Sequence, residues 1–395
     1  MEYARTLLET RGLPDVEAAA SYTPPGFYLL AVGATEFGDL VNLDEHERGV
    51  LLLNALLTVA TGLLVLVMGR LLFPNRAFLR WSALAFFVCC PVVLKTTAMF
   101  HPQPLAMFLT TVAFALCARM VVRRSYGLTS WIALAVTLAA AQLVRSVAIW
   151  AVGLILVVLV AAAVAQPERR RRIVGALGIA AVAVVLIPLP WYLHLRSTES
   201  SPIFGRGITA FSFENHWPAA FYVSSGLPDV ITEPNRVSLP PRFFPLLYAD
   251  AWGDYFGIWS WGPPRPELTA GVNRRLMLQS AVGLPLTAFA VAGWFALVGL
   301  GLRRWREAPA RLLVALAPLA GLAAVFYYAT RGASADGDIV KTMFMLPAVP
   351  FWALSFGFAV DVLLRRSRRV TAPLLVLRAA CALVSLSYAI FAFVS

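Results

Sequence analysis

The feature that most constrains the fold is a series of long apolar blocks separated by short polar loops. The blocks run approximately over 50–72, 82–98, 104–121, 128–144, 147–165, 173–193, 277–302, 311–329, 342–364 and 372–394. A helix needs about 20 residues to cross the hydrocarbon core of a bilayer. Only 14% of the 395 residues are charged, against about 25% in soluble domains. The sequence therefore predicts an all-α polytopic membrane protein with about ten transmembrane helices. Because only Arg145 and Ser146 separate 128–144 from 147–165, we expect a tight hairpin or a pair of short helices there.

Arginine clusters occupy alternate loops and predict the topology. They are Arg70, Arg76 and Arg80; Arg119, Arg123 and Arg124; "ERRRR" at 168–172; "RRWREAPAR" at 303–311; and "RRSRR" at 365–369. Positive residues stay on the cytoplasmic side of a membrane, so all five clusters should face the cytoplasm. This pattern also accounts for the net charge of +12 and argues against a nucleic-acid partner.

The remaining segments are then extracytoplasmic. We divide the chain into a first outer loop with a Pro-Pro corner (1–49), helices 1–6 (50–193), an aromatic-rich outer segment (194–276) and helices 7–10 (277–395). The composition, rich in Arg, Ala and Val, is typical of a GC-rich bacterial genome. We therefore expect a multi-pass protein of the bacterial cytoplasmic membrane, with its site facing outside.

Ionisable residues at the outer membrane edge are the functional candidates. The chain has only two lysines, Lys95 and Lys341, and both are predicted at that edge, as are Arg145 and Arg331. A lysine ammonium suits a phosphate oxygen, so these four cations indicate a site for an anionic headgroup. The alternative for a single lysine is a side chain that snorkels from a helix end.

Polar and aromatic residues surround these cations in the predicted outer loops. His101 and Gln103 lie in "KTTAMFHPQPLAMF" (95–108), and Asp250, Trp252, Asp254, Tyr255 and Trp259 lie in "YADAWGDYFGIWSWGPPRPE" (248–267). The aromatics fit an interfacial belt or a platform for sugar rings. In "SYTPPGFYLL" (21–30), Pro24 and Pro25 cannot continue a helix, so we expect a rigid corner between Tyr22 and Tyr28 beside the cleft.

Five segments together resemble a known family. They are "TPPGFYLL" (23–30), "NALLTVATGLLVLVMGRLLFP" (54–74), "KTTAMFHPQPLAMFLTTVAFAL" (95–116), "AQLVRSVAIW" (141–150) and "GDIVKTMFMLPAVPFWAL" (337–354). In this order they resemble the GT-C glycosyltransferases, which include protein O-mannosyltransferases and lipid A aminoarabinose transferases. The resemblance implies transfer of a sugar from a polyprenyl phosphate to an extracytoplasmic glycan, lipid or protein.

The resemblance also implies catalytic groups that this chain lacks at the usual place. In the family, a span and an Asp-Glu pair come directly before the first outer loop, and an acidic residue often stands where Gln103 is. Attack by an acceptor hydroxyl needs a base, and Glu2, Asp15, Glu17 and His101 are the candidates left. We expect either an N-terminally truncated sequence or a non-catalytic relative.

Two further possibilities stay open at this point. A transporter or flippase of a lipid-linked or amphipathic substrate would place polar residues near the bilayer midplane, often in related halves. A divalent metal is possible, although the four cysteines lie in apolar blocks and suggest no metal site.

Overall fold

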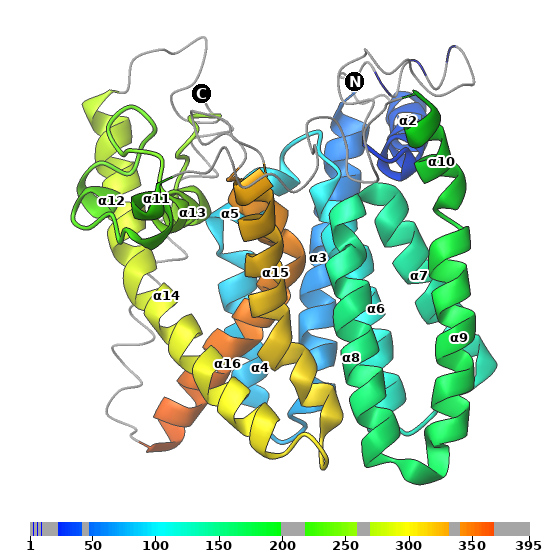
Figure 1. Cartoon of the computed structure of the whole chain (residues 1–395). Coiled ribbons are helices and arrows are strands. Elements are labelled where there is room, and N and C mark those ends of the chain that lie inside the picture. The colour runs from blue at the N-terminus through cyan, green and yellow to red at the C-terminus, as the bar shows by residue number, and fades with distance from the viewer. Residues whose placement is uncertain are drawn as a thin grey trace.

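The computed structural model describes residues 23–41, 47–198, 218–258, 269–331 and 340–366, together with Tyr3, Thr6 and Glu9. Every regular element in these residues is a helix, and the longer helices other than α2 run side by side as a bundle (Figure 1). The longer helices are α2 (Gly26–Leu40), α3 (Arg48–Leu72), α4 (Ala77–Val88), α6 (Gln103–Val122), α7 (Leu128–Val144), α8 (Ile149–Ala165), α9 (Arg170–Leu186), α14 (Ala270–Arg303), α15 (Leu312–Arg331) and α16 (Val349–Arg366). The shorter ones are α5 (Pro91–Thr97), α10 (Leu189–Thr198), α11 (Ala219–Val223), α12 (Asp229–Thr232), α13 (Phe243–Trp252), η1 (Ser146–Ala148), η2 (Pro167–Arg169), η3 (Pro309–Arg311) and η4 (Thr342–Ala348).

The helices confirm the prediction of an all-α polytopic membrane protein. Six described helices are long and apolar enough to cross a bilayer, or seven if the bent pair α4 and α5 is one span. The predicted pair of short helices is present: α7 and α8, of 17 residues each, are apolar and are joined by the single turn η1. The estimate of about ten spans is thus too high for the described residues, and block 372–394 lies outside them.

The expected continuous span over 82–98 is wrong, because the chain bends by 54° between α4 and α5. Pro91 has no amide hydrogen and disfavours helical angles in the residue before it. Cys90 accordingly takes extended angles, with φ −76° and ψ 117°. The break starts a new helix, α5, which leaves the axis of α4 and carries Lys95 toward α13.

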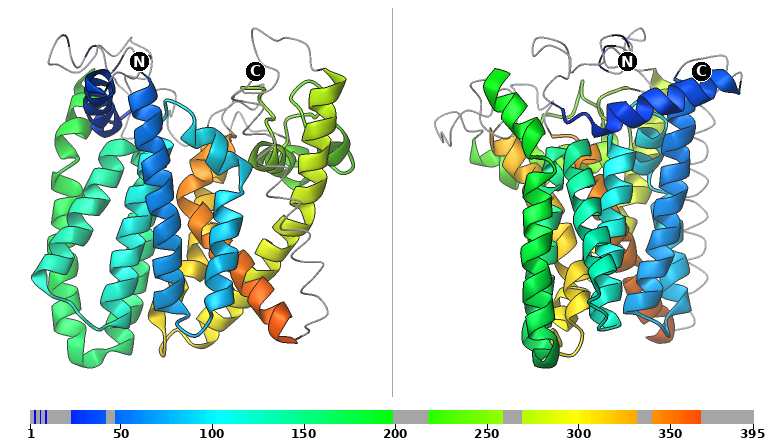
Figure 2. Two further views of the ribbon diagram at one scale, coloured as in Figure 1. Left: turned by 180° about the vertical axis from the view of Figure 1, so that it is seen from behind. Right: turned by 90° about the vertical axis from the view of Figure 1, so that its right-hand side faces the viewer.

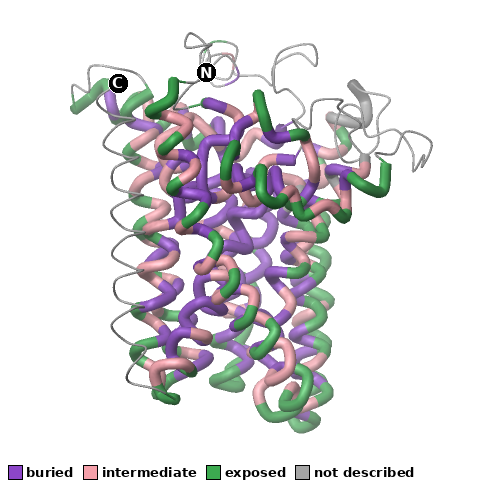
Figure 3. Tube along the Cα trace, turned by 90° about the vertical axis from the view of Figure 1, so that its left-hand side faces the viewer, coloured by how far each residue is buried: buried purple, intermediate pink, exposed green. Residues whose placement is uncertain are grey.

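The outer surface of the bundle is apolar, as a lipid environment requires. On α3 the exposed residues recur every three or four positions, at Leu52, Leu56, Val59, Leu63 and Val67. Figure 3 shows buried residues in the interior and exposed ones along the outward faces of the helices. An apolar stripe of this length on a soluble protein would be an aggregation surface.

Glycines allow α16 to approach its neighbours at backbone distance. A Cβ built on Gly357 would collide with the Leu79 carbonyl oxygen of α4, and one built on Gly293 of α14 would collide with the Ser355 carbonyl oxygen. Small residues at helix crossings are the usual way in which membrane helices pack. They fix α4, α14 and α16 as one group within the bundle.

The predicted arginine clusters meet at one end of the bundle. Arg76 pairs with the buried Asp361 at 3.1 Å, Arg311 Nε donates to the Leu72 carbonyl at 3.4 Å, and Arg124 pairs with Glu168 at 3.2 Å. The turns that carry them lie together at the bottom of Figure 1. We call this the arginine end, and the other the opposite end.

The helix α2 lies across the opposite end rather than along the bundle (Figure 2, right). Pro25 is the N-cap of α2, so the apolar residues after it are helical and not an irregular loop; the residues just before Thr23 lie outside the described ones, and the predicted corner stays a prediction. Proline is favoured at a helix start because its fixed φ suits the first turn. From Gly26 onward α2 therefore carries the chain along this end of the molecule.

Candidate functional site

The short helix α5 and the turn after it bring two predicted residues to the opposite end. The Pro91 break sets the direction of α5, and Lys95 lies one turn into it. The chain then turns through residues 98–102, and His101 precedes the first turn of α6. On α3, Asn54 holds this turn by donating to the Met99 carbonyl at 2.8 Å and more weakly to the His101 carbonyl at 3.5 Å.

Lys95 and Asp250, predicted in separate groups, form a buried ion pair. The Lys95 ammonium also donates to the Asp250 carbonyl at 2.6 Å and to the Gly253 carbonyl at 3.1 Å. Both side chains are only 2% exposed. Three contacts occupy the three donors of an ammonium group. Lys95 has no donor left for a phosphate, and it instead anchors α13 to α5.

The ion pair also fixes the segment that carries the second lysine. The other Asp250 carboxylate oxygen accepts the Thr342 amide at 2.7 Å, and the Thr342 hydroxyl donates to the Leu247 carbonyl at 2.8 Å. Lys341 comes directly before this anchored residue, and its ammonium lies 5.1 Å from the centre of the Phe256 ring. On the same ring, the Arg236 guanidinium lies 5.8 Å from the centre. Within the described residues, no carboxylate pairs with Lys341.

His101, Arg145 and Lys341 come together from three segments that are distant in the sequence, and we call them the basic cluster. Arg145 leaves α7 in an extended conformation, with φ −150° and ψ 120°, and its guanidinium lies 5.3 Å from the centre of the Phe344 ring. Burial, and then the positive charges of Arg145 and Lys341, lower the pKa of His101 to about 3. His101 is therefore neutral at physiological pH.

The hydrogen bond that His101 accepts identifies its tautomer. The Gln103 backbone amide donates to His101 Nδ1 at 3.3 Å. In a neutral imidazole one nitrogen accepts and the other carries the proton, so Nε2 is the donor. A low pKa and a protonated Nε2 make His101 a hydrogen-bond donor to a substrate rather than a good base.

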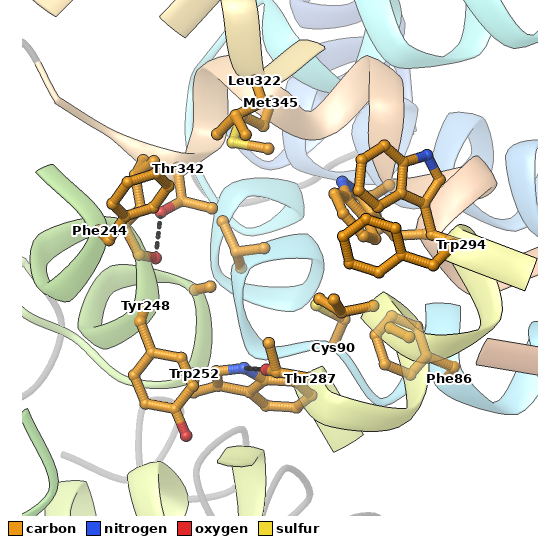
Figure 4. Close-up of a pocket in the computed structure, with 18 residues that line it drawn as sticks. Phe86, Cys90, Phe244, Tyr248, Trp252, Thr287, Trp294, Leu322, Thr342 and Met345 are labelled. Atoms are coloured by element: carbon orange, nitrogen blue, oxygen red, sulfur yellow. Dashed lines mark hydrogen bonds between the residues drawn. The ribbon is translucent and has the colours of Figure 1, made fainter. Parts of the chain in front are cut away.

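An apolar cavity of about 330 Å³ is lined in part by Thr342, the residue after Lys341. Its wall includes Thr342 and runs along α13 and the middle of α14 to Trp294 and Trp352. Figure 4 shows Phe244 and Tyr248 on one side of this cavity and Trp294 on the other. Nearly all lining side chains are aliphatic or aromatic. The arrangement places Thr342, the residue after Lys341, in the wall of an apolar space.

Several predicted aromatic and acidic residues are part of the packing. Trp252 is 7% exposed and donates to Thr287 at 2.8 Å, although its ring also lines the cavity. Tyr255 is fully buried and donates to the Leu239 carbonyl at 3.2 Å, and the buried Asp254 accepts the Ile258 amide at 3.1 Å. Trp252 thus fits both a structural role and a lining role.

The other predictions divide between the α2 region and the parts that are not described. Tyr28 is buried and its ring stacks on Tyr3 at 4.1 Å, shortly after Pro24 and Pro25 in the chain. Arg331 ends α15. Glu2, Asp15, Glu17, Tyr22 and Trp259 lie outside the described residues. No group of three potential metal ligands gathers among the residues that are described.

Sequence reasoning missed Arg236, Phe256 and Phe344. Arg236 stands in "TEPNRVSLP", where nothing distinguishes it from a solvated surface arginine. Its contact with Phe256 depends on how 235–239 folds back, with the Arg236 amide bonded to the Tyr255 carbonyl at 3.0 Å. Phe344 lies on η4 and contacts Arg145 at the end of α7, so no local spacing in the sequence indicated that contact.

Comparisons with known proteins add little to this picture. No protein-family profile and no curated protein matches the sequence. Among solved structures, the chain is similar to the crystal structure of ArnT from Cupriavidus metallidurans in the apo state. The identity is 17% over 91% of this chain and 72% of that chain, with a TM-score of 0.40. We therefore argue the function from the chain's own residues.

Proposed function

We propose that this protein is a membrane glycosyltransferase of the GT-C type, which moves a sugar from a polyprenyl phosphate to an acceptor outside the cytoplasm. The observation that carries the proposal is the basic cluster at the opposite end of the bundle together with an apolar cavity that Thr342, the neighbour of Lys341, helps to line. By the positive-inside rule this end faces away from the cytoplasm.

A polyprenyl-phosphate sugar matches both halves of this site. Lys341 and Arg145 would bind the phosphate, and Arg236 lies on the same Phe256 ring as Lys341. The isoprenoid tail would enter the cavity between α13, α14 and α16, which Thr342 helps to line. Charge that develops on the phosphate leaving group would be stabilised by fixed cations, the usual source of electrostatic catalysis.

For the proton acceptor we propose a carboxylate of the N-terminal residues, which lie outside the described part of the chain. His101 is a poor base because its pKa is low and its free nitrogen carries the proton. We therefore assign it to hydrogen bonding with the leaving group, and keep Glu2, Asp15 and Glu17 as candidate bases. Glu2 comes first in a test, because it precedes Tyr3, which packs on Tyr28.

No observation favours the transporter alternative. Buried charged side chains in the described residues are Lys95, Asp250, Asp254 and Asp361. Asp361 pairs with Arg76 at the arginine end, and the other three belong to the α5–α13 region of the opposite end. A substrate pathway would instead need polar groups at the midplane that are reachable from both sides.

The direct test is transfer of labelled sugar from polyprenyl-phosphate donors in proteoliposomes that contain the full chain. We expect Lys341→Ala and Arg145→Ala each to weaken donor binding by about 10- to 100-fold, the range for one charge-assisted contact. Arg274→Ala is the matched control, since Arg274 is an exposed arginine of α14 outside the basic cluster. Absence of both transfer and donor binding, also with an N-terminal extension encoded upstream, would overturn the proposal.

A further inference from the structure

Two buried amide side chains beside the basic cluster have polar atoms without partners. Gln103 has no exposed surface, and neither its Oε1 nor its Nε2 is hydrogen-bonded. Asn54 is equally buried; its nitrogen holds the 98–102 turn, but its Oδ1 has no partner. Buried polar atoms are almost always hydrogen-bonded in native proteins, so three such atoms in one place require an explanation.

The position of Gln103 links these amides to the donor site. Its backbone amide donates to His101 Nδ1, and His101 lies within the electrostatic influence of Arg145 and Lys341. Asn54 is tied to the same turn through the Met99 and His101 carbonyls. The unpaired amides therefore adjoin the place where the phosphate would lie.

Their chemistry selects a neutral, hydroxyl-bearing group. A carboxamide presents two donors and an acceptor, which suits hydroxyl groups that both donate and accept. The cations already supply a site for an anion, whereas the two amide oxygens are acceptors that only a donor such as a hydroxyl group can use. Leucine at position 103 would remove the unpaired atoms at no loss of a hydrogen bond, so packing alone does not account for a glutamine.

We propose that Gln103, together with Asn54 Oδ1, binds the hydroxyl groups of the donor sugar, with the phosphate held by the basic cluster. This inference rests on the proposed function and defines its sugar subsite. Because the amides are covered in this structure, sugar binding requires the surrounding side chains to move apart. Gln103 is then a binding residue whose polarity is kept for the ligand and not for the stability of the free protein.

Gln142 offers a matched control for stability. It is buried in the neighbouring helix α7, 4% exposed, and its amide donates to the Val184 carbonyl at 3.2 Å. Gln103→Leu removes unpaired atoms, whereas Gln142→Leu removes a hydrogen bond. We expect the melting temperature of the free protein to rise for Gln103→Leu and to fall for Gln142→Leu. Gln103→Met, which is unbranched like glutamine, is the second variant should leucine disturb packing.

The binding experiment compares polyprenyl phosphate with polyprenyl-phosphate glucose and polyprenyl-phosphate mannose. We expect the wild-type protein to bind at least one sugar donor about tenfold more tightly than polyprenyl phosphate. The Gln103→Leu variant should lose this tenfold gain in affinity, while its affinity for polyprenyl phosphate is unchanged. A gain retained by both Gln103 variants, or equal wild-type affinity for all three lipids, overturns the inference and leaves the phosphate site intact. No wild-type affinity for any of them overturns the proposed function as well.

Discussion

The buried Lys95–Asp250 pair gives a prediction with a magnitude that follows from its contacts. The ammonium group is compensated by one carboxylate and two carbonyls, and the carboxylate also accepts the Thr342 amide. Removing one partner of a buried ion pair leaves an uncompensated charge and destabilises a protein by about 3–5 kcal/mol. We therefore expect Lys95→Met and Asp250→Asn each to lower the free energy of unfolding by about that amount.

The double variant Lys95→Met/Asp250→Asn separates this explanation from simple loss of contacts. It buries no charge, and the side-chain oxygen of the introduced carboxamide can still accept the Thr342 amide. Only hydrogen bonds are lost, at about 1 kcal/mol each, so we expect a total loss of about 1–3 kcal/mol, smaller than for either single change. The assay is chemical denaturation of all four proteins in the same detergent, read as a double-mutant cycle.

The result that would refute this reasoning is additivity. If the double variant were as unstable as the sum of the single ones, Lys95 and Asp250 would contribute independently and no buried charge would be compensated. The same proteins also test the anchoring of Lys341. Because the double variant keeps the bond to Thr342, its affinity for polyprenyl phosphate should stay within about threefold of the wild type.

Three further predictions concern His101, the helix crossings and the cation–aromatic contacts. Folding lowers the pKa of His101 from 6.5 to about 3, so between these pH values the unfolded chain binds a proton that the folded chain does not. The free energy of unfolding should therefore fall as the pH drops below about 6.5, by up to about 1.4 kcal/mol per pH unit. His101→Asn should remove this part of the pH dependence, and an unchanged pH profile of unfolding would contradict it. Gly357→Ala should destabilise the protein by about 1–3 kcal/mol because the added methyl group collides with α4. Gly153 has open space around it, so Gly153→Ala should be neutral or slightly stabilising in the same denaturation assay. Phe256→Leu should weaken binding of polyprenyl phosphate by about twofold to fivefold, since each cation–aromatic contact is worth about 0.5–1 kcal/mol; a titration that shows equal affinity would remove Phe256 from the site.

The sequence predicted the helices well where a single physical rule decides them. Hydropathy and length located nine of the ten blocks on helices, and the arginine clusters at one end follow the topology rule. The break at Pro91 was also readable, since proline inside a helical block ends or kinks it. We missed it because the apolar run continued through residue 94.

The site was predictable only in part, because partners decide the role of a charge. The proximity of His101, Arg145 and Lys341 was expected from the topology, which sent all three turns to one end. The partner of Lys95 was not, since Asp250 is 155 residues away and nothing local indicates that its carboxylate turns inward. For Trp252 and Tyr255, the sequence could not decide between a packing role and a binding role, because the tertiary fold determines which side chains are buried.

The different surroundings of the two lysines explain how one end of the bundle can be both stable and chemically available. Lys95 has three contacts within a buried frame, whereas Lys341 lies against the Phe256 ring with no carboxylate among its described partners. Neutralising Lys341 internally would stabilise the free protein but remove an anion site. The Lys95–Asp250 pair instead fixes the backbone at Thr342, which lines the cavity. Lys341, the residue before it, stays half-buried. A substrate phosphate would supply the missing counter-charge to Lys341. Binding of the phosphate should therefore also raise the free energy of unfolding of the protein.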